Sequence, residues 1–115
     1  MEIRLIVIRT DDLKRLVDFY TLLGLDFIYH KHGNSPFHYS TKIGQTTLEI
    51  YPMTKNQKEP DKTLRLGFAV DNFEDIVASL KDRDIALLSE PILTDFVFMT
   101  IISDPDGRKV EIYKK

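Results

Sequence analysis

The sequence predicts an α+β fold made of two tandem modules, each with a strand, an amphipathic helix and three further strands. Apolar side chains recur at helical spacing in two stretches, and the segments between them are rich in the β-branched and aromatic residues typical of strands. This order repeats at an offset of about sixty residues, and the similar tetrapeptides LEIY (48–51) and VEIY (110–113) close the two halves. Such a repeat indicates duplication of a unit that cannot bury its apolar face alone.

Module one is expected to span residues 1–53. Its opening strand, residues 3–8, is rich in β-branched side chains. The short polar residues at 10–12 suit a helix N-terminus, and Gly24 suits the position that follows a helix. The apolar stripe of this helix consists of Leu13, Leu16, Val17, Tyr20 and Leu23. Three more strands are predicted at 26–31, 37–43 and 46–51, with turns at 33–36 and 44–45.

Residues 54–62 contain no large apolar side chain and are expected to link module one to module two, residues 63–115. Asp71 followed by Glu74 predicts a capping box at the start of the second helix. The apolar stripe of that helix consists of Phe73, Ile76, Val77 and Leu80. Strands are predicted at 63–70, 85–88, 96–103 and 108–113, with Pro91 in a loop and a type I turn at 104–107. We expect residues 1–115 to form a single domain.

Composition excludes several classes of function. The chain has 115 residues and a formal net charge of −2 with both signs interspersed, so it lacks the basic patch expected of a nucleic-acid-binding protein. It has no apolar run long enough to span a bilayer, and its N-terminus lacks the pattern of a signal peptide. Cysteine is absent, which excludes disulfides, thiolate nucleophiles and cysteine metal sites. We therefore expect a cytoplasmic protein without nucleic-acid or membrane partners.

Strand alternation sorts the closing strands into two faces. Leu48 and Ile50 point to one face of module one, and Glu49 and Tyr51 point to the other. In module two Val110 and Ile112 oppose Glu111 and Tyr113, and Arg65 belongs to that polar face together with Gly67 and Ala69. A central glutamate with a neighbouring tyrosine in both modules favours a concave ligand pocket, although a solvated sheet face is the simpler alternative.

The chain contains three histidines, which the prediction places on one hairpin. His30 and His32 are two apart at a strand end and share a face, and His38 lies in the next strand. The simplest interpretation is that they are polar residues of an exposed hairpin. Three imidazoles are also sufficient to bind zinc or copper. Alternatively they line the mouth of a pocket and contact an acidic or aromatic ligand, with Tyr29, Phe37 and Tyr39 forming the rest of the rim.

Two stretches resemble the glyoxalase/bleomycin-resistance/dioxygenase superfamily, also called vicinal oxygen chelate proteins. Residues 7–25 carry Asp12-Leu13, then Phe19-Tyr20, then Leu23-Gly24, and residues 104–112 are similar to the terminal DPDG-x-x-(V/I)-E-(L/I) signature of that family. The resemblance covers essentially the whole chain. It implies two βαβββ modules with curved mixed sheets that enclose a cavity, often completed by a second subunit, so we expect a homodimer that binds a small molecule.

The resemblance also implies where a metal would bind. Ligands in the metal enzymes of the family come from the first and last strands of each module, which here correspond to Leu5 and Glu49 in module one and Arg65 and Glu111 in module two. Two carboxylates hold a divalent ion weakly, and a guanidinium repels it. We therefore predict that the family metal site is lost, that no cofactor is present, and that Arg65 pairs with Glu111.

Three functions follow from this sequence. The first is a metal-free small-molecule-binding protein, similar to the bleomycin-resistance branch. The second is a lyase, isomerase or dioxygenase relative with a relocated metal site or metal-free acid–base chemistry, in which Glu49 is the candidate base and Arg65 orients an anionic substrate. The third is a structural or regulatory dimer. The candidate ligand-binding residues are Glu49, Tyr51, Arg65, Glu111, Tyr113, His30, His32 and His38.

Overall fold

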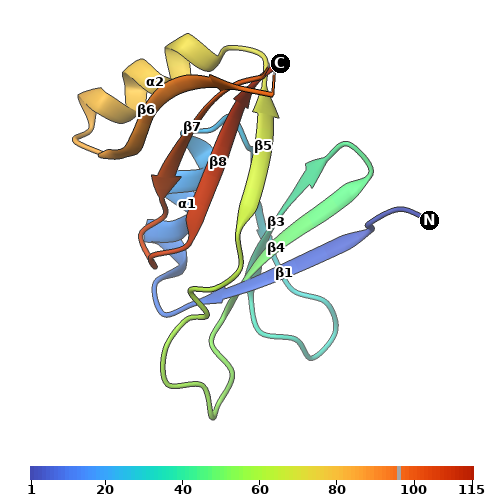
Figure 1. The fold of residues 1–115 in the computed structure, drawn as a ribbon. Coiled ribbons are helices and arrows are strands. Elements are labelled where there is room, and N and C mark those ends of the chain that lie inside the picture. Colours follow the sequence, from blue (N-terminus) through green and yellow to red (C-terminus); the bar gives the residue numbers. More distant parts are fainter. Residues whose placement is uncertain (96) are drawn as a thin grey trace. The chain divides into compact units, whose positions relative to one another are not determined.

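The computed structural model describes residues 1–95 and 97–115, which form two compact units, residues 1–61 and 62–115 (Figure 1). Each unit contains one helix and a four-stranded mixed sheet, so the predicted α+β fold with two tandem modules is confirmed. The boundary between the units falls inside the predicted linker, and the assignment of 1–115 to a single domain remains a prediction. No helix among the described residues has the length and apolar character needed to cross a membrane.

In the first unit the closing strand lies beside the opening strand. The sheet order is β1-β4-β3-β2, in which β1 and β4 run parallel and the other neighbours run antiparallel. This arrangement brings the closing glutamate of the module into the middle of the sheet. The elements of this unit are β1 (Leu5–Thr10), α1 (Leu13–Thr21), β2 (Ile28–His30), β3 (His38–Ile43) and β4 (Thr46–Pro52).

Helix α1 begins and ends close to the predicted positions. The Asp12 side chain accepts a hydrogen bond from the backbone N–H of Arg15, which satisfies one of the free donors at the helix N-terminus. The helix ends at Thr21, earlier than the apolar stripe suggested, because the N–H groups of residues 22–24 turn back to carbonyls three residues earlier. Gly24 then adopts φ = +103°, which favours glycine, and the chain leaves the helix.

The two faces of the first sheet differ as alternation predicts. Leu48 and Ile50 are 1% and 0% exposed, and they belong to the core with Leu16 and Tyr20 of α1, which lies against β3 and β4. The pairing register places Glu49 on the opposite face, beside Val7 of β1 and Ser40 of β3. This opposite face, called the polar face below, carries the candidate site.

The second unit repeats this topology, with sheet order β5-β8-β7-β6 and a parallel β5–β8 pair. The duplication inferred from the sequence therefore extends to the order and direction of the strands. Val110 and Ile112 are both fully buried, whereas Glu111 lies on the other face, opposite Gly67. The elements are β5 (Leu66–Val70), α2 (Phe73–Asp82), β6 (Leu87–Thr94), β7 (Val97–Ser103) and β8 (Lys109–Lys114).

Three local predictions for the second unit are wrong. Strand β5 begins at Leu66, so Arg65 lies just before the strand. The capping box is absent, because Asn72 is the N-cap without a side-chain bond and Glu74 instead forms an ion pair with Lys114.

Pro91 lies within β6 where a loop was predicted. An edge strand tolerates proline because one row of its N–H groups has no partner strand, and the register of β6 shifts between Ser89 and Ile92. The predicted strand 96–103 corresponds to β7, and its first residue, Phe96, lies outside the described residues.

The turn between β7 and β8 is held by a buried ion-pair network. The N–H of Gly107 donates to the carbonyl of Asp104 at 2.9 Å, as expected for the predicted turn. Arg108 is 1% exposed, and its guanidinium lies 3.2 Å from the Asp104 carboxylate and 3.0 Å from that of Asp106. Burial acts to lower the pKa of Arg108, but its hydrogen bonds and charge interactions with Asp106 and Asp104 outweigh burial and raise that pKa. The DPDG segment therefore serves the fold.

Candidate functional site

The three histidines and Glu49 converge on the polar face of the first sheet. His30 of β2 lies directly opposite His38 of β3, and the register of β3 with β4 places Glu49 and Tyr51 on the same face. His32, two residues beyond His30 and outside the strand, completes the group. One ligand atom from each of the three imidazoles and from Glu49 lies within 4.8 Å of the others. The structure therefore brings Glu49 together with three histidines that the sequence placed on a common hairpin.

The carboxylate of Glu49 lies close to two of the three imidazoles. Its Oε2 atom lies 3.4 Å from Nε2 of His32 and 3.3 Å from Nε2 of His38. Glu49 is 7% exposed and His38 is fully buried, whereas the His32 side chain is 60% exposed. The interpretation of the histidines as polar residues of an exposed hairpin is therefore wrong for His38. A buried imidazole beside a buried carboxylate is an arrangement that can hold a cation or move a proton.

Neighbouring groups fix the orientation of the His38 ring. Its Nδ1 donates a hydrogen bond to the carbonyl of Pro36 at 3.0 Å, since a carbonyl can only accept. The ring also stacks on Tyr51, with centroids 4.0 Å apart and an interplanar angle of 10°. The guanidinium of Arg9 lies 5.0 Å from the Tyr51 centroid and donates to the carbonyl of Pro52. Tyr51, predicted as a ligand-binding residue, therefore packs against a residue of the site.

The aromatic residues of the hairpin do not surround the histidines. Tyr29 and Tyr39 are paired across β2 and β3, one residue out of step with His30 and His38, and so they point to the opposite face. Phe37 stacks on Tyr29 with a centroid distance of 5.0 Å. The predicted binding rim of Tyr29, Phe37 and Tyr39 around the histidines is therefore wrong.

An open pocket of about 490 Å³ lies beside the histidine–glutamate group. Its lining contains two basic side chains, Arg4 and Lys42, and one acidic side chain, Glu49. Neither basic residue was predicted from the sequence, although Lys42 lies in the strand next to Glu49 and its side chain points to the same face as that of Ser40. The pocket is lined by Arg4, Leu5, His30, His32, Ser40, Lys42, Thr47 and Glu49.

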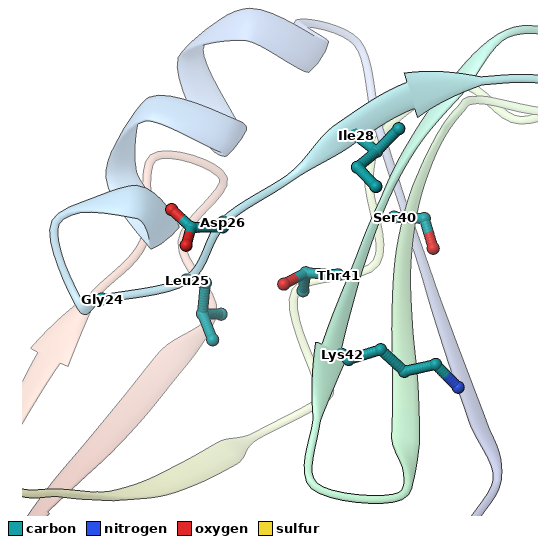
Figure 2. Close-up of a pocket in the computed structure, with 7 residues that line it drawn as sticks. All are labelled: Gly24, Leu25, Asp26, Ile28, Ser40, Thr41 and Lys42. Carbon is teal, nitrogen blue, oxygen red and sulfur yellow. The ribbon is translucent and has the colours of Figure 1, made fainter.

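A second pocket, of about 420 Å³, lies at the edge of the first sheet where β2 is too short to cover β3 (Figure 2). Figure 2 shows Thr41 projecting toward the segment at 24–26, while Ser40 and Lys42 project to the other side of β3. Ser40 and Lys42 line both pockets, whereas Thr41 lines the second pocket and not the first. The second pocket is lined by Gly24, Leu25, Asp26, Ile28, Ser40, Thr41 and Lys42 and contains no histidine.

The corresponding position of the second unit holds a different arrangement. Arg65 Nε donates to Glu111 Oε2 at 2.6 Å, as predicted, and the hydroxyl of Tyr113 donates to the other carboxylate oxygen. The bond from Tyr113, followed by that from Arg65, lowers the pKa of Glu111, and the same bond raises the pKa of Tyr113. The Tyr113 ring lies over Gly67, where a Cβ atom would come within 3.2 Å of it. Both oxygens of Glu111 are therefore engaged within the unit.

The residues at the family's metal positions do not fit a metal ion. Leu5 offers no ligand atom, and the cationic Arg65 is bonded to the carboxylate that would bind the metal from the second unit. A fixed positive charge 2.6 Å from a ligand oxygen opposes a divalent cation there. The two closing glutamates therefore have different neighbours. Glu49 lies among imidazoles, and Glu111 forms an ion pair with Arg65.

The fold and the matching positions of its closing strands define a protein of two tandem βαβββ modules. The family model described as "Glyoxalase/Bleomycin resistance protein/Dioxygenase superfamily" matches residues 2–112. The chain belongs to this superfamily. Among curated proteins, none matches this sequence.

Solved structures of similar fold include proteins with different printed functions. The chain is 16% identical to "Oxidase ChaP-H2", covering 100% of this chain and 94% of that one with a TM-score of 0.79. It is 21% identical to TnmS3, an antibiotic binding protein from Streptomyces sp., covering 99% and 95% with a TM-score of 0.76. It is 17% identical to lactoylglutathione lyase from Agrobacterium tumefaciens, covering 98% and 92% with a TM-score of 0.71. At these identities the similarity establishes the fold alone.

Proposed function

We propose that this chain is a small-molecule-binding protein of the superfamily that has lost the family metal site and takes an anionic organic ligand in the pocket of the first unit. The observation that carries the proposal is the pocket of about 490 Å³ in which Arg4 and Lys42 accompany His30, His32 and Glu49. This volume lies in the range of pockets that hold small organic molecules. The two basic side chains favour a carboxylate, phosphate or phenolate group on the ligand.

The comparison with TnmS3 supports a binding function without deciding the ligand. That protein is named as an antibiotic binding protein, whereas another structure of similar fold is named as a lyase. Because one fold can carry either function, the residues of the site must decide between a binding protein and an enzyme. Here Arg65 bonded to Glu111 and the apolar Leu5 favour a protein without metal at the family positions.

A second candidate function is an enzyme related to the lyases, isomerases or dioxygenases of the superfamily. The buried carboxylate of Glu49, with imidazole nitrogens at 3.3 and 3.4 Å, favours it, because such a group can accept a proton from a bound substrate. An enzyme converts the ligand into a product that NMR or mass spectrometry detects, and Glu49→Gln abolishes that conversion. A binding protein returns the ligand unchanged.

The binding proposal predicts a charge-dependent response to ligands. In a thermal-shift screen of small carboxylates, phosphates and neutral analogues, we expect anionic compounds to raise the melting temperature, because binding stabilises the folded state by mass action. The Arg4→Gln/Lys42→Gln double variant should lose this shift. Lys55→Gln, a change of the same kind in the exposed linker, should retain it. The proposal fails if anions do not bind, or if they stabilise the double variant as much as the parent chain.

A cytoplasmic homodimer is the form in which we propose that the protein acts. The polar face of the first sheet exposes apolar side chains, with Leu5, Val7 and Ile28 exposed by 54%, 39% and 68%. Apolar groups on one sheet face are suited to contact with a second copy. Light scattering of the purified chain should therefore give twice the 13.4 kDa mass of one copy. A monomeric mass would contradict both the dimer and the alternative of a purely structural or regulatory dimer.

A further inference from the structure

The histidine–glutamate group on the first sheet has the composition of a transition-metal site. Imidazole nitrogens suit zinc, nickel, copper and iron, and a single carboxylate is a common fourth ligand. Three elements supply the group, since His30 lies on β2, His38 on β3 and Glu49 on β4, and His32 follows β2. Their ligand atoms lie within 4.8 Å of one another. Of these residues, only Glu49 corresponds to a position from which the family takes its metal ligands.

The tautomer of His38 leaves a lone pair aimed into the group. Because Nδ1 carries the proton donated to Pro36, Nε2 of the neutral ring is unprotonated. This Nε2 is buried and makes no hydrogen bond among the described residues, although Glu49 Oε2 lies 3.3 Å away, because an unprotonated imidazole nitrogen and a carboxylate oxygen are both acceptors. Nε2 of His30 is likewise buried without a hydrogen-bond partner in the described part of the chain. These two buried nitrogens lie beside a carboxylate and have no hydrogen-bond partner in the described part of the chain. A cation bound between them accounts for this arrangement.

The distances also suit a bound ion. A tetrahedral site with metal–ligand bonds of about 2.05 Å has ligand atoms about 3.3 to 3.4 Å apart. The separations of Glu49 Oε2 from the His38 and His32 nitrogens, 3.3 and 3.4 Å, match this value. The widest pair of ligand atoms, at up to 4.8 Å, must approach by more than about 1 Å when an ion binds. The bond from His38 Nδ1 to a backbone carbonyl is the usual support of a metal-bound imidazole.

We propose that His30, His32, His38 and Glu49 bind one divalent transition-metal ion, with zinc as the ion that fits best. The ion bridges strands β2, β3 and β4 on the polar face and reaches solvent on the side of His32, next to the pocket lined by Arg4 and Lys42. A site with these ligands differs from the family positions Leu5, Arg65 and Glu111. The inference goes beyond the proposed binding function and does not depend on it, because metal binding is measured without any organic ligand.

The test is calorimetric titration of Zn²⁺ into protein stripped with EDTA and desalted, at neutral pH. We expect one equivalent of zinc per chain. His32→Ala removes an exposed ligand, so the variant should still fold, and Glu49→Gln removes the carboxylate. Each substitution should raise the dissociation constant for zinc about 100-fold or more. Even substitutions outside the ligand shell typically reduce metal affinity by about 10- to 100-fold. Glu111→Gln is the matched control and should bind zinc like the parent chain.

A second readout separates loss of a ligand from loss of structure. Co²⁺ bound by three imidazoles and a carboxylate has the intense visible absorption of a four-coordinate ion, and this absorption should be missing in Glu49→Gln while the far-ultraviolet circular dichroism is unchanged. The proposal is overturned if zinc binds more weakly than about 100 µM, far weaker than structural sites. It is also overturned if His32→Ala and Glu49→Gln bind zinc like the parent chain, or if Glu111→Gln abolishes binding.

Discussion

Replacing Arg108 with methionine is expected to lower the free energy of unfolding by about 3–5 kcal/mol, the usual cost of removing one partner from a buried ion pair. The guanidinium is 1% exposed and contacts the carboxylates of Asp104 and Asp106, which are themselves 3% and 8% exposed. Methionine fills much of the volume but leaves two buried negative charges close together. The side chain of Asp104 also accepts the backbone N–H groups of Asp106 and Arg108, so the turn itself is weakened.

Lys109→Met is the matched control for this prediction. It removes the same charge one residue further along the chain, from an exposed side chain. Urea unfolding followed by circular dichroism should give a free energy close to that of the parent for Lys109→Met, and a much lower one for Arg108→Met. Equal, small effects of about 0.5 kcal/mol for the two variants would show that the network around Arg108 contributes no more than an exposed charge.

The second large effect is expected at the repeated tetrapeptides. Ile50→Ala and Ile112→Ala should each lower the free energy of unfolding by about 2–5 kcal/mol, because each deletes a fully buried branched side chain and leaves a cavity. Both residues occupy the third position of the repeat, on the core face of the parallel strand pair of their unit. The two units should therefore depend on this position to a similar extent.

Thr47→Ala provides the comparison from the polar face. Thr47 lies in the same strand as Ile50, on the polar face, and is half-buried. Its replacement should change the free energy of unfolding by less than about 1 kcal/mol, as is usual away from buried positions. If Thr47→Ala destabilises the protein as much as Ile50→Ala does, the assignment of the two faces is wrong.

Much of the fold could be predicted because its signals are local. Alternation in β4 and β8 separates Ile50 and Ile112 from Glu49 and Glu111, and the Asp12 cap marks the start of α1. The pairing of Arg65 with Glu111 was also predictable, since the first and last strands of a module are neighbours in the family to which the sequence is similar. Each of these features is determined by residues close together in the sequence, or by a motif that both modules contain.

The site was harder to predict because it depends on how strands pair. Whether His38 is exposed is decided by the register of β2, β3 and β4, which brings His38 over Tyr51 and beside Glu49. The orientation of Tyr29 and Tyr39 was predictable, since strand alternation places them on the face opposite the adjacent His30 and His38. Pro91 shows the same limit, because a proline is tolerated in a strand only at a sheet edge, and edges are a property of the whole sheet.

The most direct test of a metal site on the first sheet is anomalous X-ray diffraction from crystals grown with one equivalent of Zn²⁺. A single strong peak at the zinc edge is predicted between the His30, His32 and His38 nitrogens and the Glu49 carboxylate, with ligand distances of about 2.0–2.2 Å. A peak on Glu111, with Arg65 displaced from it, or no peak on the protein at all, would contradict the account.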